Sequence, residues 1–136
     1  MSLKTTRIFY WTTFALSVII LPLNIGLGLF ATGIFILPVL ILHVMIGFGL
    51  DVLKDHPRLI VLSPINLLVF VLIRPDGVHT LTDSGMSAVL RIFGIHAGYS
   101  YKYEDYFFFG SLILLGIQLI IDLRLRTIIR AGDYST

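Results

Sequence analysis

The longest uncharged stretch of the chain runs from Ile8 to Leu50 and holds 43 residues without Lys, Arg, Asp or Glu. A helix rises about 1.5 Å per residue and needs about 20 residues to cross the hydrocarbon core of a bilayer. The stretch therefore predicts two membrane-spanning helices joined by a tight turn. Residues that break helices or tolerate positive φ place this turn between residues 22 and 33. They are Pro22, Asn24, Gly26, Gly28 and Gly33.

The composition also indicates a membrane protein. Of the 136 residues, 57% are hydrophobic and 13% are charged, whereas a soluble domain carries about 25% charged residues. The absence of cysteine excludes a disulfide scaffold and thiolate metal sites. A net charge of +2 is too small to indicate a nucleic-acid partner. We expect a single membrane domain over residues 1–136, with lipids at its surface.

Two further apolar segments complete the predicted set of spans. The uncharged run Leu59–Ile73 has 15 residues, which is short for a span. The segment over residues 105–124 has acidic residues at its start and arginines at its end, the signs that complement a helix dipole. The sequence thus predicts an all-α integral membrane protein with four transmembrane helices. Their approximate ranges are residues 8–26, 31–50, 58–74 and 105–124.

Residues 75–104 form a polar connection between the third and fourth predicted spans. Four apolar residues in it recur at the spacing of one helical face, namely Met86, Val89, Leu90 and Phe93. Thr82, Asp83 or Ser84 could cap the start of such a helix, and Gly94 or Gly98 could end it. We expect a short amphipathic helix on the membrane surface. The alternative is a helix that packs over the bundle as a lid.

Basic residues are distributed unequally between the two sides of this arrangement. Seven of the ten Lys and Arg residues fall on the side of the two termini. They are Lys4, Arg7, Lys54, Arg58, Arg124, Arg126 and Arg130. Because Lys and Arg near the ends of spans resist translocation, we expect a multi-pass protein with both termini in the cytoplasm.

His43 is the one imidazole deep inside a predicted span. Ionisable residues in lipid suggest a functional site by default, so His43 is the candidate cofactor-binding residue. A neutral imidazole there could ligate a metal or haem, relay a proton or bond to a quinone. The alternative is a structural His that bonds to a polar group on a neighbouring helix. No second His lies in a span, so a haem held by two histidines of this chain is not expected.

The outer connection offers a candidate metal site. His79 and Asp83 are four residues apart and would share a face of a helix, and His96 follows in the same connection. Two imidazoles with a carboxylate could suit zinc, copper or iron. The alternative is that these residues are surface groups that cap and solvate the loop.

Other polar residues are scattered among the spans rather than aligned on one helical face, as a pore would require. We therefore expect Asn66 and Gln118 to form hydrogen bonds between helices. Asp122, near the end of the last span, is expected to pair with Arg126 or Lys54. The sequence contains no phosphate-binding glycine loop and no hydrolase nucleophile motif.

These features favour a small structural or accessory subunit of a larger membrane protein complex, without enzymatic activity of its own. Its partners would be other membrane subunits or further copies of the chain. Glycines spread along the spans support this hypothesis, because one interior has no place for all of them and some would face a partner helix. Two alternatives stay open. One is a small oligomeric transporter or pore, and the other is a redox or metal-dependent membrane enzyme that uses His43, or His79 with His96.

Overall fold

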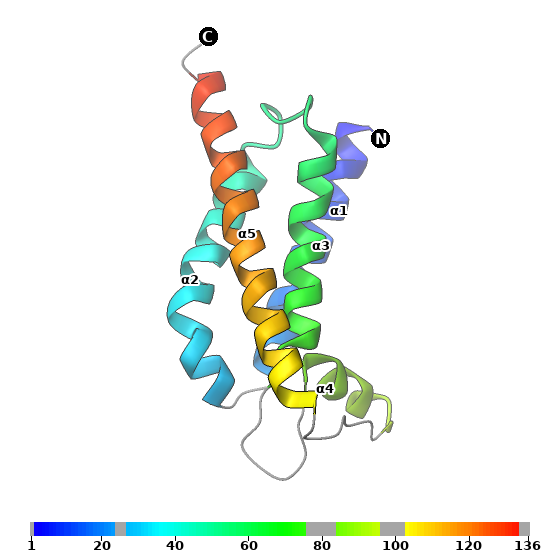
Figure 1. The fold of residues 1–136 in the computed structure, drawn as a ribbon. Coiled ribbons are helices and arrows are strands. Elements are labelled where there is room, and N and C mark those ends of the chain that lie inside the picture. Colours follow the sequence, from blue (N-terminus) through cyan, green and yellow to red (C-terminus); the bar gives the residue numbers. More distant parts are fainter. Residues whose placement is uncertain (1, 24–26, 76–83, 96–102, 134–136) are drawn as a thin grey trace.

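The computed structural model describes residues 2–23, 27–75, 84–95 and 103–133, and this part of the chain is helical (Figure 1). Its only pairing of the β type within those ranges is an isolated bridge between Pro75 and Ser84. The elements are α1 (Leu3–Ile20), the short 3-10 helix η1 (Leu21–Leu23), α2 (Leu27–Phe48), α3 (Pro57–Ile73), α4 (Gly85–Ile92) and α5 (Glu104–Asp133). The prediction of an all-α chain is confirmed.

Local sequence signals explain where several helices begin and end. Ser2 caps α1, since its side chain accepts a hydrogen bond from the Thr5 amide. Pro57 occupies the first turn of α3, where its missing N–H costs nothing. Ser84 caps α4 by accepting from the Ser87 amide at 3.2 Å. Gly94 follows that helix with a φ of +75°, a conformation that glycine adopts without strain.

The predicted boundaries differ from the observed ones mainly at α1 and α5. The first helix starts at Leu3 and ends at Ile20, whereas the predicted range was 8–26. Helix α2 begins at Leu27, before the predicted start at residue 31. The last helix continues to Asp133, beyond the predicted end at 124. Leu, Ile and Arg are good or tolerated helix formers, so the change from apolar to basic residues does not end the helix. The change marks only where the apolar surface stops.

Within the described residues, two helices are long and apolar enough to cross a membrane, over Leu3–Leu23 and Asp105–Gly132. The segments Gly33–Phe48 and Pro57–Ile73 are apolar but shorter. At about 1.5 Å per residue, the 17 residues of α3 extend over roughly 25 Å.

The four long helices run along one bundle, and both chain termini lie at the same end of it (Figure 1). The short helix α4 lies at the opposite end. In the interior, α3 packs against α1 and α5, and α5 also packs against α2. Seven of the basic residues therefore belong to helix ends and links at the end that carries the termini.

Two glycines allow close contact between helices inside the molecule. A Cβ atom on Gly47 would overlap the Trp11 ring, so α1 and α2 approach closely there. A Cβ on Gly49 would lie 2.6 Å from Ile129 Cδ1 of α5. Gly116 is different, because nothing lies within 4 Å of the position its Cβ would take. Only some of the glycines therefore allow close contacts between helices inside the molecule.

Candidate functional site

His43 lies fully buried on α2, and its ring stacks with two aromatic rings of α1. Its ring stacks on Tyr10 with centroids 4.7 Å apart and an interplanar angle of 13°. The Phe14 ring also stacks on this imidazole, at 5.0 Å and 20°. The Tyr10 hydroxyl also donates a hydrogen bond to the His43 carbonyl oxygen at 2.9 Å. The imidazole is thus fixed in orientation by α1.

Asp122 on α5 is also fully buried, and it faces His43. Its Oδ1 accepts hydrogen bonds from Ser63 Oγ at 2.7 Å and from Gln118 Nε2 at 2.9 Å. Its Oδ2 lies 3.4 Å from His43 Nδ1. The predicted pairing of Asp122 with Arg126 or Lys54 is therefore wrong. The reason is that α5 turns Asp122 inward, where its partners are on α2, α3 and its own helix.

Asn66 of α3 joins the same network. Its Nδ2 donates to the Leu114 carbonyl and to Gln118 Oε1, both at 2.9 Å. Gln118 Nε2 in turn donates to Ser63 Oγ at 3.0 Å. The prediction that Asn66 and Gln118 form hydrogen bonds between helices is confirmed.

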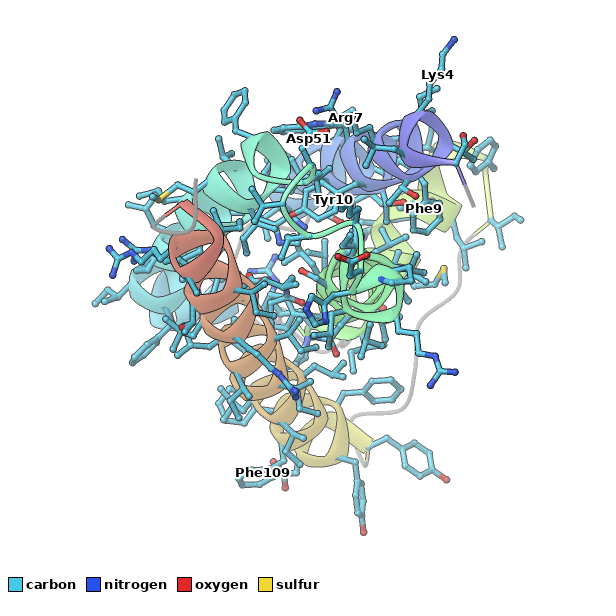
Figure 2. All side chains as sticks on the ribbon, turned by 90° about the horizontal axis from the view of Figure 1, so that it is seen from above. Lys4, Arg7, Phe9, Tyr10, Asp51 and Phe109 are labelled. Carbon is cyan, nitrogen blue, oxygen red and sulfur yellow. The ribbon has the colours of Figure 1, made fainter. Side chains whose placement is uncertain are left out.

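These side chains form one unit, which we call the buried polar cluster. It consists of Tyr10, His43, Ser63, Asn66, Gln118 and Asp122. Every member is at most 7% exposed, and all four long helices contribute. Figure 2, a view along the bundle, shows Tyr10 extending from α1 toward the middle of the molecule, whereas Lys4 points outward.

An apolar group of side chains lies on each side of the buried polar cluster. Toward the end with the termini are Ile46, Leu50, Leu53, Ile60, Ile121 and Leu125, next to the Tyr10 ring. Toward the end with α4 are Phe14, Ile36, Val39, Leu67, Phe70, Val71 and Leu115. The polar groups therefore occupy a layer between two apolar layers, which keeps the layer away from water at both ends.

The geometry does not suit nucleophilic catalysis by Ser63. In a Ser-His-Asp triad the nucleophile and the carboxylate bond to opposite nitrogens of the imidazole. Here Ser63 Oγ and Asp122 Oδ2 both lie 3.4 Å from Nδ1, and the Ser63 hydroxyl donates to Asp122. Among the described residues, His43 Nε2 has no hydrogen-bond partner. The cluster can hold helices together and can hold a proton.

The candidate metal site in the outer connection lies outside the described residues, since His79, Asp83 and His96 all do. Within the described part of the chain, no group of three or more His, Cys, Asp or Glu residues could hold a metal ion. A cofactor at His43 stays a prediction. The contacts of His43 with polar groups of neighbouring helices are those expected for a structural histidine, which was the alternative interpretation of this residue.

Comparisons with protein-family models, with curated proteins and with solved structures find no match.

Proposed function

We propose that the chain is a four-span integral membrane protein that acts as a small structural subunit of a larger membrane assembly. The observation that supports this proposal is how the polar groups are used. The polar side chains of the cluster bond to other helices of the same chain, and the outer faces of the helices are apolar. Such a molecule offers lipid and partner helices an apolar contact surface.

The exposed faces of α2 and α5 support a membrane location for these two helices. On α2 the exposed large apolar residues are Ile34, Phe35, Leu37, Ile41, Met45 and Phe48. On α5 they include Phe109, Ile113, Ile117, Ile120 and Leu123. Soluble monomers rarely expose contiguous apolar patches above a few hundred Å². In a bilayer the same faces contact lipid and do not need to be covered by protein.

The packing of α4 supports its proposed place at the membrane surface. Its small residues Gly85, Ser87 and Ala88 are buried, and a Cβ on Gly85 would overlap the Val71 carbonyl oxygen of α3. Met86 and Ile92 of α4 are 46% and 65% exposed, and Phe93, which follows the helix, is 74% exposed. A helix with this distribution lies with its apolar face in the headgroup boundary.

The charge distribution supports an orientation with both termini in the cytoplasm, and this is testable by labelling. The chain has no natural cysteine, so single cysteines can be introduced by Ser2→Cys, Thr136→Cys and Ser100→Cys. We expect an impermeant thiol reagent added outside intact cells to modify only the cysteine at position 100. Modification at either terminus would contradict the four-span arrangement.

The interior favours a structural subunit over a conduit. A pore needs polar side chains lined up along an open path. The polar residues that the structure describes in the middle of the bundle are instead closed in between apolar layers and bonded to one another. Such bonds are typical of contacts that hold membrane helices together.

Gly116 marks the surface at which we propose that a partner helix packs. It is exposed on α5, its Cβ position is open, and its neighbours Ile113, Ile117 and Ile120 are exposed as well. Small residues let membrane helices approach closely, because lipid supplies no hydrophobic drive for association. The partner would be a transmembrane helix of another subunit.

The test is purification in mild detergent with stoichiometric analysis of attached chains. We expect the wild-type chain to retain a partner in a fixed ratio, and Gly116→Leu to lose it while helical content is kept. Ile120→Leu, a conservative exchange on the same face, should retain the partner. A wild-type chain that is a monodisperse monomer in several mild detergents, with no attached protein, would overturn the proposal. Solute flux in vesicles that contain only this chain would favour the transporter instead.

A further inference from the structure

The direction of each hydrogen bond in the buried polar cluster can be assigned from one fixed acceptor. The Leu114 carbonyl can only accept, so the Asn66 group that faces it is the NH₂ group. The same nitrogen contacts Gln118, which must therefore present its oxygen there. The Gln118 NH₂ group is then the part that faces Ser63 and Asp122.

The donors of Ser63 and Gln118 consequently converge on Asp122. Ser63 receives a hydrogen from Gln118, so its own hydroxyl hydrogen goes to Asp122 Oδ1. The second N–H of Gln118 reaches the same oxygen. An ionised carboxylate accepts hydrogen bonds and donates none. This is the environment of a carboxylate, and Oδ2 is left to share a proton with His43 Nδ1 at 3.4 Å.

With a single proton, the pair of His43 and Asp122 would carry a net charge of −1 inside the molecule. Both side chains are fully buried, and apolar layers lie on either side of them. An uncompensated charge in such surroundings is far more costly than an unsatisfied N–H group. A second proton removes the net charge.

Among the described residues that contact the imidazole, no other group can supply that compensation. From α1 the titratable neighbour is Tyr10, whose hydroxyl already donates to the His43 carbonyl. From α3 the ring meets the Ser63 hydroxyl, and from α5 it meets Gln118 and Asp122. No Lys or Arg is among these contacts. The remaining place for a proton is His43 Nε2, a buried atom for which the described part of the chain provides no hydrogen-bond partner.

We infer that His43 Nε2 and Asp122 form a proton-binding site within the membrane-embedded bundle. A proton on Nε2 makes the pair neutral, as an imidazolium with a carboxylate or as an imidazole with a carboxylic acid. The stacked rings of Tyr10 and Phe14 attract positive charge on the imidazole through their π faces. The ligand of the site is a single proton, and the site is independent of any partner subunit.

The test counts protons on the pair by NMR at neutral pH. Purified full-length chain would carry ¹⁵N in histidine and ¹³C in the aspartate carboxyl groups, and His43→Gln and Asp122→Asn would identify the signals. We expect Nε2 to be protonated and the pair to hold two protons in total. The exposed His56 provides the reference for an imidazole in contact with water. An unprotonated Nε2 beside an ionised Asp122 would overturn the inference.

A variant provides the second measurement. In Asp122→Asn the counter-charge is absent, so we expect the His43 ring to be neutral with a single N–H. A doubly protonated ring in this variant would also overturn the inference, because His43 would then carry its charge without regard to Asp122. If this variant does not fold, the proton count on the wild-type chain decides.

Discussion

Asp122→Ala is expected to lower the free energy of unfolding by about 3 kcal/mol. This value is at the lower end of the cost of removing one partner of a buried ion pair. The substitution leaves the Ser63 hydroxyl, one Gln118 N–H and His43 Nδ1 without their acceptor. Reversible unfolding in mixed micelles, followed by circular dichroism, would measure the loss.

Two variants separate this effect from a general loss of charge. Asp55→Ala removes an exposed carboxylate, and its effect should stay within about 0.5 kcal/mol. Asp122→Asn keeps an acceptor oxygen and should cost less than Asp122→Ala. If Asp122→Ala unfolds at the same denaturant concentration as Asp55→Ala, the cluster contributes nothing to stability and its structural role is refuted.

Gly47→Leu is expected to destabilise the bundle by about 2 to 3 kcal/mol, the usual cost of overpacking an interior. The added side chain would have to displace the Trp11 ring, which also packs on Phe14 and Phe48. The α1–α2 contact would open as a result, and unfolding in mixed micelles again provides the measurement.

The matched control is the same exchange at an open position. Gly116→Leu adds its side chain where nothing lies within 4 Å, so its effect on unfolding of the isolated chain should be small. Equal effects of the two leucines would show that helix propensity dominates and that the close α1–α2 contact is unimportant. Gly116→Leu thus tests partner binding and Gly47→Leu tests the fold.

Local signals in the sequence were enough to predict the helical class and several helix ends. Ser84, one of three candidate caps, and Gly94, one of two candidate ends, act through their own backbone or the next turn, so their effects can be read without a tertiary structure. The extension of α5 to Asp133 was missed because apolar composition reports the surroundings of a helix and not its length.

The inward position of Asp122 was missed because a charge near the end of a predicted span resembles a solvated end group. A signal was present in the spacing of most buried residues along α5, among them Ser111, Leu115, Gln118, Asp122 and Leu125. They recur every three or four residues and share one face. The pairing of Asp122 with His43 was not predictable, because His43 lies 79 residues away in the sequence and only tertiary packing brings the two together.

The polar layer between two apolar layers restricts how the helices can move. If α5 slid along its axis by one turn, Gln118 and Asp122 would face apolar side chains of the neighbouring layer and lose the partners on α2 and α3. A single polar position in an apolar helix contact is known to fix helix register in this way. Axial sliding is therefore costly at the level of this layer, whereas tilting about it keeps the hydrogen bonds. Conformational change in this bundle should accordingly occur by pivoting around the layer that contains His43 and Asp122.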